Sequence, residues 1–140
     1  MYKRQHLSGT SKVTIKLASS KPAANLSVWL VSLPWEKSEP GKRIKLTDNL
    51  ITRGWADPQN NQSLTESQPL EPGKFYELTF PLQPDDHIVK AGQQIGLMIF
   101  SSDRDFTLWP EPGTELTIDL DGTSLELPIV GGASGLNFQP

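Results

Sequence analysis

Few side chains in this chain could do acid–base or nucleophilic chemistry. Its 140 residues include two histidines, His6 and His87, and no cysteine. A serine hydrolase needs a base within hydrogen-bond reach of its nucleophile, and donors for the oxyanion. His6 lies in a stretch that we interpret as a leader or cut edge, and His87 follows Asp86 in a proline–aspartate turn that predicts a solvated side chain. No Gly-x-Ser-x-Gly motif occurs, so we expect no catalytic residue here.

Two pairs of aspartates could offer oxygen ligands to a metal ion. Asp103 and Asp105 flank Arg104, and Asp119 and Asp121 flank a leucine. Calcium prefers such ligands, but neither pair completes a known ligand loop. The Asp-Arg-Asp cluster is more simply an ion-pair network, and the second pair serves a turn. We therefore expect no metal and no cofactor.

The four tryptophans could form an aromatic platform for a sugar. Trp29 lies in an apolar run, and Trp55 and Trp109 close strand ends near proline, where a ring can be half-buried with its N–H satisfied. Only Trp35 is predicted to be exposed, and one ring does not make a platform. Core packing is the preferred interpretation, and a freestanding carbohydrate-binding module is kept as the alternative.

Charge and hydropathy exclude two classes of partner. The formal net charge of -3 and the pI near 5.3 provide no basic field for phosphates, so we expect no nucleic acid. No apolar run approaches the roughly 20 residues that cross a bilayer, so we expect no membrane segment.

The element around which these residues are predicted to gather spans residues 94–110. Isoleucine and leucine alternate with glycine, methionine and phenylalanine along residues 95–100, so both faces of an extended segment are apolar. This pattern predicts a buried central strand. The polar SSDRD segment at its exit is where a functional loop is expected.

Shorter alternating runs predict the other strands. The first two runs are expected to form a hairpin-like pair, and Asp121-Gly122-Thr123 predicts a hairpin between the last two. With no helical period, 12 prolines and 11 glycines, the chain is predicted to be an all-β sandwich with Greek-key or jelly-roll connections. We divide it into a leader or cut edge (1–8), a sandwich domain (9–132) and a flexible tail (133–140). The alternating runs are residues 12–17, 26–31, 50–56, 76–80, 116–120 and 125–129.

Three segments together resemble a known family. They are ITRGWADPQN (51–60), LTFPLQPDDHIVKAGQQIGLMIFSSDRDFTLWP (78–110) and PGTELTIDLDGTSLELPIVGG (112–132). They look like the C-terminal domain of bacterial Xaa-Pro dipeptidyl-peptidases, serine peptidases related to cocaine esterase. The resemblance implies a galactose-binding-like jelly roll that follows a catalytic α/β-hydrolase domain, and it implies that an N-terminal strand is missing here. The catalytic residues of the family belong to that other domain, so the resemblance places none on this chain.

The expected function is therefore that of a non-catalytic C-terminal β-sandwich domain that packs on the hydrolase domain of its parent enzyme. The resemblance implies a parent that releases N-terminal Xaa-Pro dipeptides from proline-containing peptides. It leaves a homodimer open, and it favours the cytoplasm slightly, with secretion kept as the alternative. By its position at strand ends, the candidate interdomain surface is predicted to comprise Trp55, Asp57, Asn60, Asp103, Arg104, Asp105 and Trp109.

Overall fold

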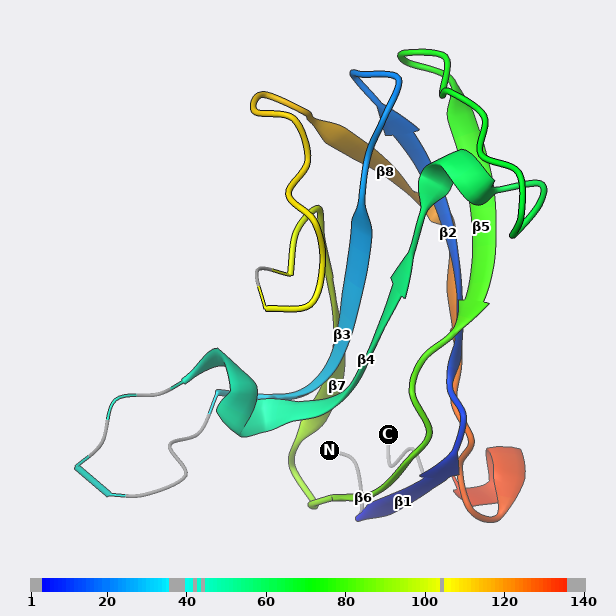
Figure 1. Cartoon of the computed structure of the whole chain (residues 1–140). Helices are drawn as coiled ribbons and strands as arrows, with labels where there is room; N and C mark the ends of the chain where they lie inside the picture. The colour runs from blue at the N-terminus through cyan, green and yellow to red at the C-terminus, as the bar shows by residue number, and fades with distance from the viewer. Residues whose placement is uncertain (1–3, 36–39, 42, 44, 104, 136–140) are drawn as a thin grey trace.

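The computed structural model describes residues 4–35, 40–41, 43, 45–103 and 105–135 (Figure 1). Within these ranges no helix has the length and apolar character needed to cross a membrane. The helical segments are the short 3₁₀ turns η1 (Leu46–Asn49), η2 (Pro58–Asn60) and η3 (Gly132–Gly135). The strands are β1 (Gln5–Gly9), β2 (Lys12–Ser19), β3 (Leu26–Leu33), β4 (Leu50–Ala56), β5 (Phe75–Pro81), β6 (Asp85–Val89), β7 (Gln94–Phe100) and β8 (Leu116–Glu126).

The strands form two antiparallel three-stranded sheets, in the orders β5-β2-β8 and β4-β3-β7, with β1 and β6 paired separately. Most neighbours in a sheet are not consecutive in the sequence, so the chain crosses from one sheet to the other several times. Figure 1 shows the two layers, with β2, β5 and β8 on one side and β3, β4 and β7 on the other. The predicted all-β sandwich is confirmed, and its strand order is not that of a simple meander.

The core lies between the middle strands of the two sheets. In β2, alternate residues from Val13 to Leu17 are completely buried, as the alternation of the sequence predicts. They face Leu26, Val28 and Leu30 of β3, which belong to the same cluster. Burial of each such side chain contributes about 1.5–3 kcal/mol to folding, so these two strands hold the sandwich together.

The prediction that residues 94–100 form the central strand is wrong. The middle strand of its sheet is β3, which is buried along both faces, whereas β7 lies at the edge and all its residues are exposed or half-buried. The sequence of β7 is apolar on both faces for another reason. Its outer face lies against the aromatic cluster described below, and its inner face borders the core.

The predicted pairing of the first two runs is also wrong, because β2 and β3 lie in different sheets. Residues 20–25 connect them and carry the chain from one layer to the other. This connection contains Pro22 and is longer than the two-residue turns that fix a hairpin.

The predicted hairpin at Asp121-Gly122-Thr123 is replaced by a β-bulge. Strand β8 runs through this segment, and β2 pairs with it on both sides, at Lys16↔Asp119 and Thr14↔Ser124. Gly122 does not have a positive φ. Instead, a Cβ at Gly122 would lie 2.6 Å from Cδ of Lys16, so glycine is required there by the close approach of that side chain.

Part of the predicted leader is folded. Residues 5–8 lie in β1, where Gln5 pairs with Val89 of β6, while residues 1–3 and the tail from 136 to 140 lie outside the described residues. His6 Nε2 contacts Asp86 Oδ1 across this pair of strands. His87 is half-buried in β6 opposite Leu7, so the prediction of a solvated turn residue is wrong. The division at residues 9 and 132 stays a prediction.

Candidate functional site

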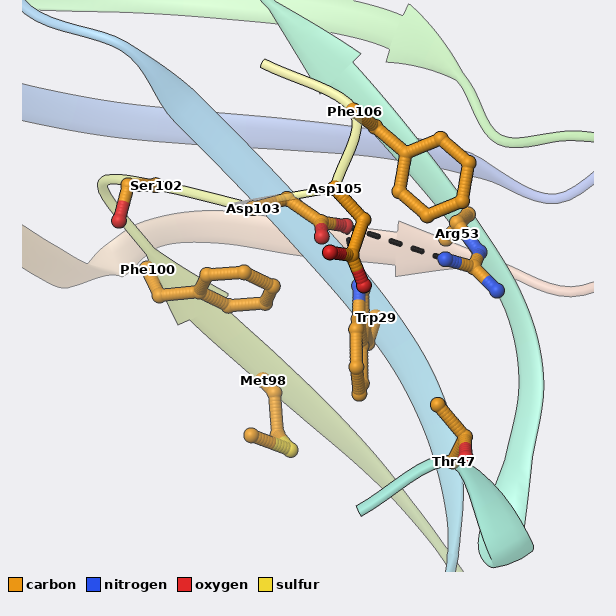
Figure 2. Close-up of a pocket in the computed structure, with 9 residues that line it drawn as sticks. All are labelled: Trp29, Thr47, Arg53, Met98, Phe100, Ser102, Asp103, Asp105 and Phe106. Carbon is orange, nitrogen blue, oxygen red and sulfur yellow. Dashed lines mark hydrogen bonds and ion pairs between the residues drawn. The ribbon is translucent and has the colours of Figure 1, made fainter. Parts of the chain in front are cut away.

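One part of the candidate surface is a buried carboxylate, Asp103, just after β7. Its side chain is 5% exposed and accepts a hydrogen bond of 3.1 Å from Trp29 Nε1. Arg53 Nη1 lies 3.9 Å from the same carboxylate. Figure 2 shows the three side chains directed toward one another from the loop, β3 and β4. A buried carboxylate is stable only with such partners, so Asp103 fixes the loop to the outer face of the sheet.

The loop continues over the same face through an aromatic ring. The Phe106 centroid lies 4.6 Å from the guanidinium carbon of Arg53 and 5.5 Å from the ring centroid of Trp55. The Arg53 guanidinium also lies 5.5 Å from the Trp29 ring, so it is stacked between two aromatic groups. These contacts leave a pocket of about 410 Å³ whose walls are mostly apolar. It is lined by Trp29, Thr47, Arg53, Met98, Phe100, Ser102, Asp103, Asp105 and Phe106 (Figure 2).

The segment after β4 provides the second part of the surface. Asp57 caps η2 by accepting a hydrogen bond of 2.9 Å from the Gln59 amide. Asn60 donates to the Ser63 carbonyl and accepts from the Ser67 hydroxyl. These polar groups are used to build the loop. The carbohydrate alternative gains no support from them and stays a prediction.

The loop after β7 also presents large apolar side chains to solvent. Leu108 is 86% exposed and Trp109 is 65% exposed. Both follow Phe106, the ring that contacts Arg53 and Trp55. The Leu108 carbonyl accepts a hydrogen bond of 2.5 Å from Asn25 Nδ2, which holds this part of the loop beside the start of β3. A second pocket, of about 270 Å³, brings Leu108 together with Trp55 and Asp57.

The structure thus brings most of the predicted surface residues into one region. Trp55 and Asp57 meet the loop after β7, and Asp103 and Asp105 line the pocket beside it. Arg104 lies outside the described residues, so the predicted Asp-Arg-Asp network is not assessed. The arginine beside Asp103 in the described chain is Arg53.

Four residues of this region were not predicted, namely Trp29, Arg53, Phe106 and Leu108. Trp29 was expected in the core, and it is buried, but on the outer face of the sheet beside Arg53. The pairing of those two residues across β3 and β4 gives no signal in the sequence before the register is known. Of the other rings, Trp35 is half-buried rather than exposed, and Trp109 is more exposed than predicted. The N–H of Trp55, which was expected to be satisfied, is buried without a hydrogen-bond partner among the described residues.

The side chains of the region are held by a hydrogen bond, an ion pair and ring contacts. No group of three or more histidine, aspartate or glutamate side chains within the described ranges could hold a metal ion.

The second aspartate pair, Asp119 and Asp121, lies at the bulge in β8. There the Lys16 ammonium bonds to Asp119 at 2.8 Å and holds the pKa of that carboxyl below its usual range. Asp119 also accepts from the amides of Asp121 and Gly122.

Comparison with known proteins gives a consistent assignment. A family model described as the X-Pro dipeptidyl-peptidase C-terminal non-catalytic domain matches residues 1–138. A protein of Rhodopirellula baltica named as an Xaa-Pro dipeptidyl-peptidase is 63% identical over 134 residues, which are 96% of this chain and 21% of that protein. The Xaa-Pro dipeptidyl-peptidase of Lactobacillus delbrueckii subsp. lactis is 32% identical, over 86% of this chain and 18% of its own length. The chain therefore spans about a fifth of the length of these relatives.

Solved structures have the same fold as part of larger hydrolases. An α-amino acid ester hydrolase superposes with a TM-score of 0.71 at 16% identity, over 91% of this chain and 24% of that protein. An aminopeptidase from a marine sediment archaeon of the Thaumarchaeota superposes with a TM-score of 0.69 at 18% identity, over the same shares of the two chains. At these identities the likeness shows the fold alone.

Proposed function

We propose, because this chain belongs to the family of X-Pro dipeptidyl-peptidase C-terminal non-catalytic domains, that it packs as a rigid β-sandwich on the catalytic α/β-hydrolase domain of a longer polypeptide. That polypeptide is expected to release N-terminal Xaa-Pro dipeptides, as the names of the relatives suggest. The sandwich would supply no reacting group. Its role is to support the catalytic domain and to wall the entrance to the active site.

The observation that carries this proposal is the docking loop, which we define as residues 101–109 and whose second half exposes large apolar side chains. Its base contacts the sheet through Asp103 and Phe106, while Leu108 and Trp109 keep most of their surface exposed. Tryptophan is among the side chains enriched at the hot spots of protein interfaces, and neighbouring exposed apolar side chains such as Leu108 mark interaction sites. The exposed carboxylate of Asp57 borders the loop and that of Asp105 belongs to it, and both suit the polar rim of an interface.

The test replaces Leu108 by serine in the chain expressed together with its catalytic domain. Because the Leu108 side chain is almost fully exposed, the same substitution should leave the stability of the isolated sandwich within about 0.5 kcal/mol. In the complete polypeptide, which is about five times as long as this chain in its relatives, loss of an interface anchor should lower the unfolding midpoint by about 1 °C for each kcal/mol of docking energy lost. Turnover of an Xaa-Pro chromogenic substrate should fall with it.

Val130→Ser is the matched control. Val130 is also an exposed apolar residue, but its backbone bonds to His6 of β1 and not to the docking loop. The proposal is rejected if Leu108→Ser changes neither the midpoint nor the kinetics of the complete polypeptide.

A homodimer of the complete polypeptide is a further assembly that the family resemblance suggests. Light scattering after size-exclusion chromatography measures it directly. A mass equal to one polypeptide at micromolar concentration would exclude it.

A further inference from the structure

The larger pocket beside the docking loop has an excess of negative charge among its lining side chains. Asp103 and Asp105 come from the loop and Arg53 comes from β4, so two carboxylates and one guanidinium leave a formal charge of -1. Thr47 and Ser102 add hydroxyl groups, and the rest of the wall is aromatic or apolar. Aromatic walls and unbalanced carboxylates both attract a cation.

Arg53 neutralises these carboxylates only in part. Its Nη1 atom lies 3.9 Å from Asp103 Oδ2, beyond hydrogen-bond distance, and its guanidinium is stacked against the rings of Trp29 and Phe106. The same Oδ2 atom accepts the hydrogen bond of the Trp29 indole. No described residue forms a hydrogen bond or an ion pair with Asp103 Oδ1 or with the Asp105 carboxylate. Because a buried carboxylate oxygen without a donor is costly, a donor that enters the pocket would stabilise it.

The two carboxylates are directed into the pocket rather than away from it (Figure 2). Asp103 is 5% exposed, whereas Asp105 is exposed at the rim. Trp29 and Phe100 form another wall, and their rings meet edge to face with a centroid distance of 5.4 Å. The volume of about 410 Å³ is far larger than a single water molecule needs, so the pocket has room for a whole side-chain head group.

We propose that this pocket binds the guanidinium group of an arginine side chain that belongs to the catalytic domain of the same longer polypeptide. The arginine would donate to Asp103 Oδ1 and to the Asp105 carboxylate, and it would lie against Phe100. Its charge would bring the formal charge of the pocket to zero. This inference rests on the proposed function and deepens it, because it names the chemistry of the partner surface.

Two features favour this occupant. A guanidinium is planar, carries five N–H donors and is more weakly hydrated than an ammonium group, so it suits ring walls and several acceptors better than lysine does. In addition, the pocket is continuous with the docking loop, since Ser102, Asp103, Asp105 and Phe106 of its lining all belong to residues 101–109. A domain that docks on the exposed end of the loop would therefore reach the mouth of the pocket.

Binding of a free arginine analogue to this 140-residue chain tests the chemistry of the pocket. The probe is N-acetylarginine methylamide, and the control is N-acetylcitrulline methylamide, which has a similar shape but no charge. Fluorine NMR of the fluorotryptophan-labelled chain reports on the Trp29 ring, and Trp35, which does not line the pocket, is the internal reference.

We expect the arginine probe to shift the Trp29 signal saturably, with a dissociation constant in the millimolar range. The citrulline probe should bind about tenfold or more weakly, because hydrogen bonds to charged groups are the strong ones. Asp105→Asn should weaken binding of the arginine probe by a similar factor.

The complete polypeptide tests the source of the arginine. If a side chain of the catalytic domain fills the pocket, the Trp29 signal of the complete polypeptide should not respond to the free probe. Asp105→Asn should also lower the unfolding midpoint of the complete polypeptide but not that of the isolated chain, in which Asp105 is exposed.

Any of three results would overturn the proposal. Equal binding of the two probes, or no shift with either, would show that the pocket does not recognise a cation. Equal binding of the arginine probe to the isolated chain and to the complete polypeptide would show that no arginine of the catalytic domain occupies it. Binding that appears only after Arg104→Gln would identify the chain's own Arg104 as the occupant. Because Leu108→Ser measures docking through the unfolding midpoint, a pocket that stays open in a docked polypeptide rejects this inference alone.

Discussion

At the scale of single residues, Asp103 is the residue that attaches the loop after β7 to the outer face of the sheet. It accepts from the Trp29 indole, and its own backbone carbonyl accepts from the amides of Phe106 and Thr107. Asp103 thus connects Trp29 of β3 with the backbone of Phe106 and Thr107. These hydrogen bonds position the aromatic residues that follow in the loop.

Replacing Asp103 by alanine should destabilise the isolated chain by about 1–3 kcal/mol, because the Trp29 N–H would be left buried without an acceptor. Asp103→Asn should cost less, since its amide oxygen can still accept that hydrogen bond. Urea denaturation followed by tryptophan fluorescence measures both. Asp105→Asn is the control, because Asp105 is exposed and should change stability by less than about 0.5 kcal/mol. Equal stabilities for Asp103→Ala and Asp105→Asn would contradict the role given to Asp103.

The Lys16–Asp119 pair predicts a defined pH dependence. The Lys16 ammonium, through its hydrogen bond and charge, lowers the pKa of Asp119, and Asp119 in turn raises the pKa of Lys16. The stability gained from the carboxylate is therefore present above its unfolded pKa, about 4, and is lost as the pH falls through the lower folded pKa. The stability gained from the ammonium is present below about 10.4 and is lost as the pH rises through the higher folded pKa.

Asp119→Asn removes this charge pair while keeping an oxygen for the amides of Asp121 and Gly122. We expect the difference in unfolding free energy from wild type to be largest between about pH 5 and 9 and to shrink at both extremes. Denaturant titrations from pH 2.5 to 11 give the curve. A difference that is constant across this range would mean that the charge pair does not contribute.

At the scale of elements, the bulge in β8 keeps one strand continuous against β2. The extra residues are accommodated because Gly122 lets the Lys16 side chain pass across it. Local sequence and tertiary pairing disagree here. The Asp-Gly sequence alone favours a two-residue turn, but the alternating residues on both sides fit the same face of β2.

Gly122→Ala should destabilise the chain by about 1–3 kcal/mol, since its methyl group would overlap Cδ and Cβ of Lys16. In a Lys16→Ala background the Cδ contact is absent, so part of this cost should disappear. A double-mutant cycle from urea unfolding measures the coupling. Strict additivity would show that the close approach is not what requires glycine.

The elements that the sequence predicts correctly are those whose alternation reflects burial on one face, such as β2 and β5. Sequence cannot rank strands within a sheet, because an apolar edge strand such as β7 has the same pattern as a central one. The candidate site follows this division. Trp55, Asp57 and Asn60 are neighbours in the sequence and could be grouped in advance, whereas the approach of Arg53 to Asp103 depends on the register of β4 with β3 and on the path of the loop after β7.

At the scale of the whole molecule, a domain of the non-catalytic family has a simple kinetic expectation. The isolated 140-residue chain should hydrolyse Xaa-Pro chromogenic substrates no faster than buffer, because hydrolysis needs a nucleophile and a base in contact. In the described structure His6 contacts a carboxylate, and neither histidine bonds to a serine. The full-length Lactobacillus delbrueckii relative serves as the positive control. Turnover above background that scales with chain concentration and survives repurification would contradict the expectation.

The position of β2 between β5 and β8 has a consequence for synthesis on the ribosome. Lys12, near the start, pairs with Pro81 on one side and with Glu126 on the other. During translation β2 can therefore pair with β5 about midway through synthesis. It can pair with β8 only after most of the domain has emerged from the ribosome. Such distant pairings make folding slow, and the waiting strand is the segment that a nascent-chain chaperone would be expected to shield.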